Sequence, residues 1–354
     1  MISPVRNLTD NAKAKKSLPV ISNRVKILYL TRANLSLRRA HVYNILKTSE
    51  ALRKTGEVDV AISHRLPKNF KRDFDVLYFR DPRLVFWAVA AKFIFRKKII
   101  LELHRQPRRW REKLFWRASL HIADGIIVIT HALKDYFKNY KSKIKVVFCN
   151  TYEPEIFKPY QGLSAQEARK RLGLVVPATL LVYTGNTLTY DFSALFEAIS
   201  LIDGVVLVLV GVTNKEKMQA LAREKGVEDK VILVPRVDRH KVPLYLIAGD
   251  ILVVPYVSSE PGAFPVKIFE YLAAAKPIIS FSSDCIKEAL KHRRNAMLID
   301  PPTAENWQKA IVEIIQNPRL AEYLSFEAKK DSLLYTWERR GREIFSFLKK
   351  IYEK

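Results

Sequence analysis

A lysine and a glutamate stand three positions apart in the segment AFPVKIFEYLAAAKPII, residues 263–279. Pro265 favours the start of a helix, because its fixed φ suits the first helical position. Lys267 then lies in the first turn, where the helix dipole disfavours a cation by roughly 0.3–1 kcal/mol. A bound diphosphate would reverse this penalty, since the lysine, the free amides and the dipole would all attract it. Glu270 could then accept hydrogen bonds from the ribose hydroxyls of a nucleotide.

The same spacing also fits an i,i+3 ion pair on the helix surface, which contributes a few tenths of a kcal/mol. Gly185 and Asn186 are further candidates for phosphate binding. They follow an apolar strand and could present free backbone amides to an anion, although a simple turn fits equally well.

A histidine ends another apolar run, LELHRQP. The alternation of side chains along a strand places Glu102 and His104 on the same side. Two polar groups at the carboxyl end of an otherwise apolar strand predict a ligand cleft there. The alternative is a histidine that merely caps the strand end with its hydrogen bonds satisfied.

The elements that position these residues follow one pattern along the chain. Short β-branched apolar runs alternate with amphipathic stretches, which predicts βαβ units and parallel sheets. The fold class is therefore α/β, with two doubly wound Rossmann-like domains facing each other across a cleft. The expected strands are 25–31, 58–63, 75–80, 98–104, 125–130 and 145–149 in the first half, and 178–185, 205–211, 230–235, 250–256 and 276–281 in the second.

The expected domain boundaries follow from the same pattern. Residues 1–23 read as a flexible basic tail, 24–160 as the N-terminal domain and 161–335 as the C-terminal domain. We expect the last helix, within 336–354, to pack back on the N-terminal domain. Cys149 and Cys285 match no metal-binding spacing, so we expect ordinary buried thiols and no metal site.

The charge of the chain is strongly basic and unevenly distributed. Residues 1–160 hold 34 lysines and arginines against 13 acidic residues, so this part accounts for +21 of the total of +25. Such a field attracts nucleic acid, anionic lipid surfaces or phosphorylated substrates. The stretches 84–98 and 106–123 combine aromatic and basic residues at helical spacing, which is typical of helices on anionic membranes. Their apolar sides could equally pack on a sheet.

The sequence contains neither an apolar run long enough to span a bilayer nor the apolar core of a signal peptide. We therefore expect a cytoplasmic protein that associates peripherally with the inner face of the membrane.

The stretch PVKIFEYLAAAKPIIS resembles the donor-binding helix of retaining GT-B glycosyltransferases, in particular family 4, the group 1 glycosyl transferases. Segments 123–137 and 143–159 resemble that family's late first domain and interdomain passage. The resemblance implies a nucleotide-sugar donor, UDP- or GDP-linked, bound by the second domain without a metal ion or cofactor. It implies an acceptor, lipid-linked or a cell-surface glycan, at the first domain.

The resemblance also implies roles for individual residues. His104 would contact the transferred sugar and take part in catalysis, and Arg236 would lie near the nucleotide base. The family's mechanism is front-face attack with retention of configuration. The donor site is expected to comprise Lys267, Glu270, Gly185, Asn186, Arg236, Phe264, Pro265 and Val266.

The sequence departs from the family pattern at two places. Gly262 stands where the family often has its first glutamate, and the segment YTGNTLTYDFSAL lacks the basic pair that commonly holds the diphosphate. Lys267 would then carry more of that role. These departures keep a catalytically impaired relative open as an alternative.

Two other classes of protein fit parts of the sequence. A nucleic-acid-binding protein would explain the basic charge, but we expect no nucleic-acid partner because no binding module is recognisable. A dinucleotide-dependent oxidoreductase fits the doubled α/β pattern, yet neither domain's first strand is followed by G-x-G-x-x-G.

Overall fold

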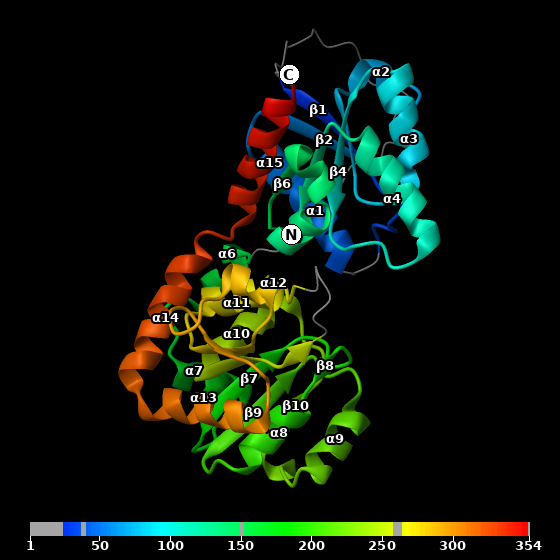
Figure 1. Ribbon diagram of the computed structural model, residues 1–354. Helices are drawn as coiled ribbons and strands as arrows, with labels where there is room; N and C mark the ends of the chain where they lie inside the picture. Colours follow the sequence, from blue (N-terminus) through cyan, green and yellow to red (C-terminus); the bar gives the residue numbers. More distant parts are fainter. Residues whose placement is uncertain (1–23, 37–39, 149–151, 258–263, 353–354) are drawn as a thin grey trace. The chain divides into compact units, whose positions relative to one another are not determined.

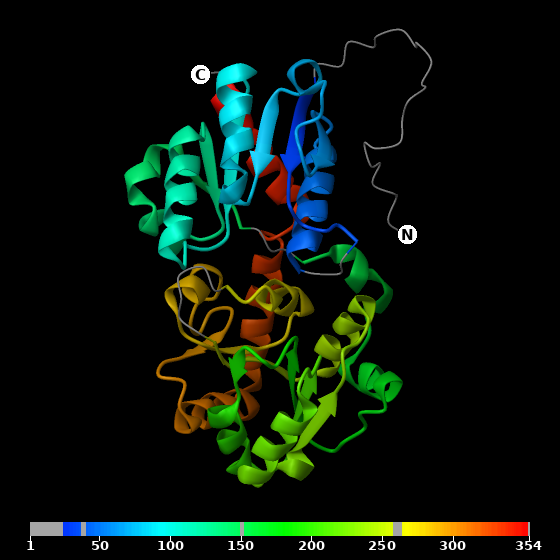
Figure 2. The same ribbon diagram turned by 90° about the vertical axis from the view of Figure 1, so that its right-hand side faces the viewer.

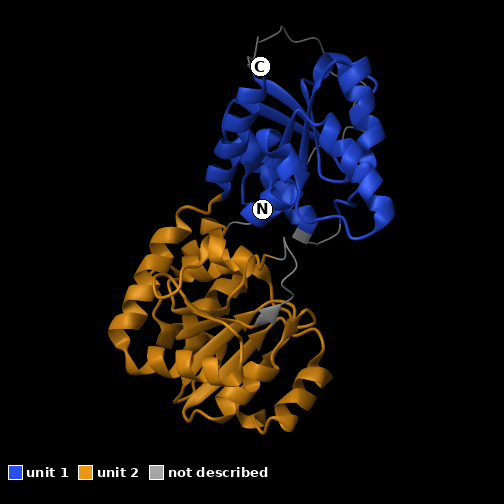
Figure 3. Ribbon diagram, in the orientation of Figure 1, with its two compact units in different colours: residues 1–149, 337–354 blue, residues 150–336 orange. Residues whose placement is uncertain are grey.

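The computed structural model describes residues 24–36, 40–148, 152–257 and 264–352. The chain divides into two compact units, residues 1–149 with 337–354 (unit 1) and residues 150–336 (unit 2) (Figure 3). The boundary expected at residue 160 therefore lies inside unit 2, among α6 (Pro154–Phe157) and η4 (Lys158–Tyr160). The predictions for the tail 1–23, for Cys149 and for Gly262 fall outside the described residues.

Unit 1 contains a parallel six-stranded sheet in the order β2-β1-β3-β4-β5-β6. The first five strands are apolar runs predicted from the sequence, whereas β6 (Ile144–Val146) only overlaps the predicted strand 145–149. Both faces of the sheet are covered by helices (Figures 1 and 2). The elements are β1 (Val25–Leu30), α1 (Ala40–Arg53), β2 (Val58–Ser63), α2 (Phe70–Asp73), β3 (Val76–Phe79), η1 (Pro82–Leu84), α3 (Val85–Val89), η2 (Ala90–Ile94), β4 (Lys98–Leu103), α4 (Trp110–Ile122), β5 (Gly125–Val128), α5 (His131–Tyr136), η3 (Lys138–Lys143) and β6 (Ile144–Val146).

The strands of unit 1 alternate between two hydrophobic cores. Leu28 and Leu30 of β1 pack into one core, and Ile27 and Tyr29 pack into the other. This explains why the strands read as continuous apolar runs rather than as alternating ones.

The last helix of the chain, α15 (Trp337–Tyr352), completes the second of these cores (Figure 1, red). It packs against α1, and Gly341 allows the close approach, because a Cβ there would overlap the carbonyl oxygen of Ala51. A segment distant in sequence thus becomes part of unit 1 and brings its side chains to the sheet.

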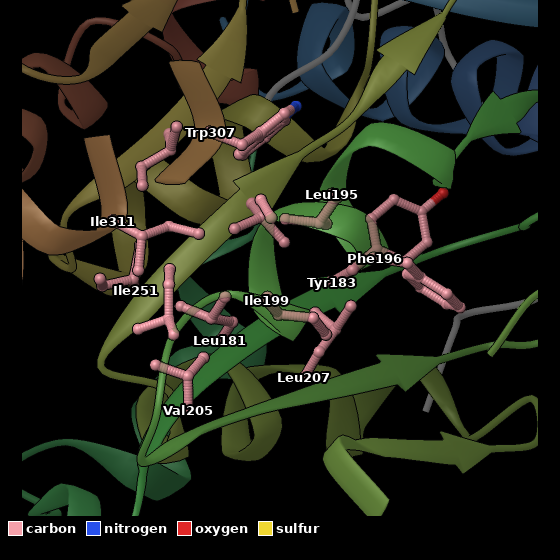
Figure 4. Packing of buried hydrophobic residues seen from close by; sticks show 14 of the residues in the cluster. Leu181, Tyr183, Leu195, Phe196, Ile199, Val205, Leu207, Ile251, Trp307 and Ile311 are labelled. Atoms are coloured by element: carbon pink, nitrogen blue, oxygen red, sulfur yellow. The ribbon is translucent and has the colours of Figure 1, made fainter. Parts of the chain in front are cut away.

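Unit 2 repeats the design with a parallel sheet in the order β10-β9-β7-β11-β13-β14. Its core lies between this sheet and helices α8 and α13, with Leu181, Leu207, Ile251 and Trp307 buried together (Figure 4). The elements are α7 (Ala165–Leu172), β7 (Thr179–Thr184), β8 (Tyr190–Asp191), α8 (Ser193–Ser200), β9 (Val205–Val210), α9 (Lys215–Glu224), η5 (Glu228–Lys230), β10 (Val231–Val234), η6 (Arg239–Lys241), α10 (Val242–Ala248), β11 (Ile251–Val254), β12 (Tyr256–Val257), α11 (Lys267–Ala274), β13 (Ile278–Phe281), α12 (Asp284–Ala289), β14 (Met297–Ile299), α13 (Ala304–Gln316) and α14 (Pro318–Ser332).

The two six-stranded parallel sheets confirm the predicted α/β class with two doubly wound halves; β8 and β12 form a separate two-stranded sheet. Cys285 is buried, as expected. Within the described ranges, none of the helices combines the length and the apolar character needed to cross a membrane.

Candidate functional site

The first strand of unit 2 ends in a turn that only glycine adopts without strain. Gly185 follows β7 with φ of +125°, and its amide donates to the carbonyl of Val210 at 2.8 Å. A Cβ at this position would lie 3.0 Å from Nζ of Lys267. The turn at the carboxyl end of the strand therefore runs directly beneath the lysine side chain.

Lys267 is the first residue of α11, as the sequence predicted for the first helical turn. Its Nζ is buried, and it has no hydrogen-bond partner among the described residues. The rings of Tyr183 and Tyr190 take the place of such partners, with their centroids 3.6 and 3.9 Å from Nζ. The N-cap residue Val266 adds no side-chain hydrogen bond to the helix start.

Burial lowers the pKa of Lys267 well below its usual value, because an ammonium group loses its hydration there; the nearby charge of Glu270 opposes this shift. The two aromatic rings also favour the charged form through cation–π attraction. The result is a buried amine whose hydrogen-bonding capacity is unused.

Glu270, three residues further along α11, pairs with Arg239 and not with Lys267. Arg239 Nη2 lies 3.0 Å from Glu270 Oε1, and Arg239 Nε donates to Glu153 Oε1 at 2.9 Å. Burial raises the pKa of Glu270, with Glu153 adding to the rise and Arg239 opposing it. The surface ion pair between Lys267 and Glu270 therefore does not describe this geometry.

Helix α11 is fixed against β7 by a buried contact. The backbone N–H of Thr184 donates to the hydroxyl oxygen of Tyr271 at 2.8 Å. This bond holds the start of the helix beside the strand end, so Lys267 and Gly185 keep their mutual position without a ligand.

The other predicted donor-site residues lie around this point with different local roles. Asn186 accepts from the Tyr183 hydroxyl through its carbonyl and from Thr213 Oγ1 through its side chain. Phe264 is buried and stacks on Phe269, Pro265 is buried, and Val266 is exposed. Arg236 is exposed, and the arginine that reaches Glu270 is Arg239.

In unit 1, His104 follows β4 and contacts the buried carboxylate of Glu102 through Nε2. The hydroxyl of Tyr78 donates to the same carboxylate, and Arg340 Nη2 donates to it at 2.9 Å. Arg340 is itself buried and also donates to Thr48 Oγ1 and to the carbonyls of Val147 and Phe148.

The electrostatics of this network fix the state of the histidine. Burial opposes ionisation of Glu102, but Arg340, the contact with His104 and, to a smaller extent, Arg80 hold its pKa well below the usual value. Burial, with the neighbouring charge of Arg80, lowers the pKa of His104 to about 4. His104 is therefore neutral at pH 7. Because the ionised Glu102 can only accept, Nε2 carries the proton and Nδ1 is left as an acceptor.

His104 also borders a cavity of about 370 Å³ in unit 1, and its side chain remains 19% exposed. The cavity lies at the carboxyl ends of β1, β3 and β4, where ligands bind in open α/β sheets. The sequence predicted His104 and Glu102 on the same side of the strand, but it did not predict Arg340, Arg80 or Tyr78 as their partners.

Two family descriptions match the chain. Residues 22–149 match Glycosyltransferase Family 4, and residues 164–331 match Glycosyl transferases group 1. A D-inositol 3-phosphate glycosyltransferase from Xylanimonas cellulosilytica is 24% identical over 196 residues, which are 53% of this chain and 46% of that protein. A chitobiosyldiphosphodolichol beta-mannosyltransferase from Debaryomyces hansenii is 25% identical over 254 residues, 64% of this chain and 54% of that protein. The chain thus spans about half the length of these curated relatives.

Solved structures match over nearly the whole chain. Sucrose-phosphate synthase from Thermosynechococcus elongatus aligns with a TM-score of 0.75 and 16% identity, covering 93% of this chain and all of that one. The Anabaena protein HepE in complex with UDP aligns with a TM-score of 0.74 and 15% identity, covering 92% and 100%. At these identities the likeness shows the fold, which is GT-B. The two family matches, which together span residues 22–149 and 164–331, show that the chain belongs to the family 4-like, group 1 glycosyltransferases.

Proposed function

We propose that the protein transfers a sugar from a UDP- or GDP-linked donor to a lipid-linked or cell-surface glycan acceptor, with retention of configuration and without a metal ion. Membership of the glycosyltransferase family supports transfer as the reaction class. Solved relatives were captured with UDP and UDP-glucose, and one curated relative is named for a diphosphodolichol-linked acceptor. These names support the donor class and a lipid-linked acceptor for this chain.

The observation that carries the proposal is the buried amine of Lys267 above the Gly185 turn. A diphosphate bound at this turn gives Nζ the hydrogen bonds that it lacks among the described residues. In the reaction, the bond between the anomeric carbon and the diphosphate oxygen breaks, and the acceptor oxygen forms the new bond on the same face. Lys267 stabilises the negative charge that develops on the leaving diphosphate. The proton of the acceptor hydroxyl passes to that leaving group.

A thermal-shift screen of the full chain against UDP-, GDP- and ADP-sugars tests the donor class. We expect one nucleotide series to raise the melting temperature, because a ligand that binds only the folded state stabilises it. The Lys267→Met variant should show a much smaller rise with the same ligand. If no nucleotide-sugar shifts the wild type at millimolar concentration, the donor proposal is wrong.

His104 contributes by accepting a hydrogen bond from a hydroxyl of the transferred sugar at its free Nδ1. We expect His104→Ala to lower turnover by at least tenfold while nucleotide affinity and melting temperature change little. Equal losses of activity and stability would instead indicate a purely structural histidine. His104 itself should add no pH dependence to the activity between pH 5.5 and 8, because its pKa of about 4 keeps it neutral there.

The acceptor class follows from an exposed apolar surface on unit 1. Phe86, Phe93, Ile94, Trp110 and Leu114 of α3, η2 and α4 each expose between 66% and 72% of their surface. Helices α3 and α4 pack side by side (Figure 1), and the rings of Phe86 and Phe115 meet at 6.3 Å. Large apolar side chains in this density mark an interaction surface.

Basic residues surround these apolar side chains, which favours an anionic membrane over a protein partner. Arg108, Arg109, Arg111 and Lys113 are all exposed, and Arg111 lies over the Trp110 ring at 5.3 Å. Two aromatic residues of the same stretches have another role: Trp116 is buried and stacks on Phe137, and Phe95 packs on Phe70. We propose that the exposed apolar and basic residues of α3, η2 and α4, and those just before α4, dock the protein on the inner, cytoplasmic face of the membrane, at a lipid-linked acceptor.

Co-sedimentation with vesicles tests this docking. Binding should require anionic lipid, fall with salt, and drop in a Trp110→Glu variant, whereas Trp116 must stay intact for folding. Tyr323→Glu serves as a control, because Tyr323 is an exposed aromatic residue of unit 2. Failure to bind anionic vesicles at low salt, or equal binding to RNA at physiological salt, would contradict the proposal.

A further inference from the structure

The cavity beside His104 is lined by more arginines than the chemistry of a neutral sugar requires. Arg32 lies two residues after the end of β1, Arg80 lies directly after β3, Arg83 lies within η1, and Arg105 follows His104. Asp81 is the acidic residue among the described lining residues. The carboxyl ends of neighbouring parallel strands thus place several guanidinium groups around one space.

Two of these arginines are neutralised by partners of their own. Arg83 forms a bidentate pair with Asp81, with contacts of 2.9 and 2.7 Å. Arg105 donates to Glu112 at 2.9 Å. These ion pairs hold the two arginine side chains in place at the cavity wall, and they add little net charge to the cavity.

The other two arginines give the cavity a positive surplus. Arg32 is exposed and forms no ion pair within the described ranges of the chain. Arg80 lies 4.0 Å from Glu102, but that carboxylate is also bonded by Arg340 at 2.9 Å, so one negative charge faces two guanidinium groups. The low pKa of His104, to which Arg80 contributes by its charge, is consistent with a positive local potential.

We infer that this cavity binds an anionic group of the acceptor, a phosphate ester, held by Arg32 and Arg80 next to the neutral His104. The inference rests on the proposed function and deepens it by naming the acceptor's chemical class. Planar guanidinium groups suit phosphate because they donate two parallel hydrogen bonds. A volume of about 370 Å³ corresponds to about a dozen waters, which is room for a phosphate and part of a sugar ring.

The binding of inorganic phosphate to the full chain, followed by calorimetry at low salt, tests the inference directly. The titration is made on wild type and on Lys267→Met, in which the proposed donor site is impaired. We expect both to bind phosphate, and Arg32→Gln to weaken binding by about tenfold or more, since a hydrogen bond to a charged group is lost. Arg65→Gln is the matched control, because Arg65 is an exposed arginine of unit 1 that does not line the cavity.

A second variant, Arg80→Lys, keeps the charge next to Glu102 but removes the planar fork, and it should weaken phosphate binding less than Arg32→Gln. Nucleotide-sugar affinity is measured on the same samples. Loss of phosphate binding in Lys267→Met with full binding in Arg32→Gln would place the anion in the donor site alone and overturn the inference, while leaving the proposed function intact. Absence of phosphate binding from wild type would also overturn it. Failure of nucleotide-sugar binding, with the phosphate results as expected, would refute the proposed function and not the anion site.

A co-sedimentation experiment with vesicles distinguishes the two possible sources of the phosphate, a lipid headgroup and a soluble sugar phosphate. If a lipid headgroup supplies it, Arg32→Gln should also reduce sedimentation with phosphatidic acid vesicles and free phosphate should compete. If a soluble sugar phosphate supplies it, vesicle binding should be unchanged in Arg32→Gln.

Discussion

Glu102, near the carboxyl end of β4 in unit 1, and the buried amine of Lys267, at the start of α11 in unit 2, have opposite surroundings in the fold. Glu102 receives hydrogen bonds from Tyr78, His104 and Arg340. Lys267 receives two aromatic faces and, among the described residues, no hydrogen bond. Burying an ion without compensation is expensive, and natural structures rarely leave a buried polar atom unsatisfied.

The difference indicates different purposes. A buried carboxylate whose hydrogen bonds are all made within the protein stabilises the fold, and it orients the histidine beside it. A buried amine that lacks hydrogen-bond partners gains them only when a ligand binds. Arg340 and Glu102 should therefore respond to mutation mainly through stability, and Lys267 mainly through ligand binding.

The largest expected effect is on the unit 1 network. Arg340→Met leaves Glu102 buried without its main counter-charge, and we expect the free energy of unfolding to fall by about 3–5 kcal/mol. The measurement is urea denaturation at pH 7. The control is Arg339→Met, in the preceding position of α15, where a half-exposed pair with Glu343 contributes little.

A decrease of less than about 1 kcal/mol in the unfolding free energy of Arg340→Met would contradict the role of Arg340 as the main counter-charge of Glu102. Crystal structures or chemical shifts of His104 in the variant provide a second reading, because its orientation depends on the same carboxylate.

The next effect concerns Lys267. We expect Lys267→Met to weaken nucleotide-sugar binding by about 1.5–3 kcal/mol, the range for hydrogen bonds to charged groups. Its unfolding free energy at pH 7 should be unchanged or higher, because a buried amine is replaced by an apolar chain of similar length. The control is Lys276→Met: burial lowers the pKa of that lysine too, but it lies two residues before β13, at the amino end of that strand, whereas Lys267 lies beside the carboxyl end of β7.

Donor affinity unchanged in Lys267→Met, or equally reduced in Lys276→Met, would show that the position of the buried amine above Gly185 has no special role. Calorimetry measures the donor affinity of both variants and so distinguishes a specific effect of Lys267 from a general effect of removing a buried lysine.

A smaller effect appears as a pH dependence of donor binding. Because burial lowers the pKa of Lys267 in the free protein and a diphosphate would raise it, binding should take up a proton. Affinity should then fall with rising pH above the depressed pKa, by up to about tenfold per unit. Repeating the calorimetry in buffers of different ionisation enthalpy measures the proton directly, and Lys267→Met should show no such uptake.

The lowered pKa of Lys267 also makes the stability of the folded protein depend on pH, and this dependence has the opposite direction to that of donor binding. Between the depressed pKa and the ordinary value of 10.5, the unfolded chain binds more protons than the folded one, so Lys267 makes stability rise with pH in that window. His104 acts similarly at lower pH, since its pKa falls from 6.5 to about 4 on folding and stability is lost as pH falls across that interval.

The sequence predicted the sheets because their signal is local. Apolar runs such as VKILYL and TLLVYT identify buried parallel strands by themselves. The strand β14 was not predicted, since the three residues MLI carry too little pattern. Nor was the placement of the domain boundary, which depends on which contacts a linker makes.

The candidate site was predictable only in part. The first-turn position of Lys267 and the shared side of Glu102 and His104 follow from helix and strand periodicity. Their partners do not: Arg340 is 238 residues away from Glu102, and only the path of α15 back to unit 1 brings it there. In the same way, the segment RVDRHK contains both Arg236 and Arg239, and only the geometry of the turn decides that Arg239 reaches Glu270.

The smallest effect tests what holds Lys267 when no ligand is bound. Burial raises the pKa of Tyr190 to about 12, so its hydroxyl stays neutral at physiological pH and the attraction comes from the ring rather than from a phenolate. Removing the ring in Tyr190→Leu takes away one cation–π contact, which contributes about 0.5–2 kcal/mol to the charged lysine. The pKa of Lys267 should fall further, and donor affinity at pH 8 should drop a few-fold. Tyr190→Phe keeps the ring and should bind like wild type. Because Tyr190 packs on the unit 2 core, melting temperatures of both variants are measured alongside. Equal donor affinities in the leucine and phenylalanine variants would mean that the ring does not support the ammonium group, and that Tyr183 alone suffices.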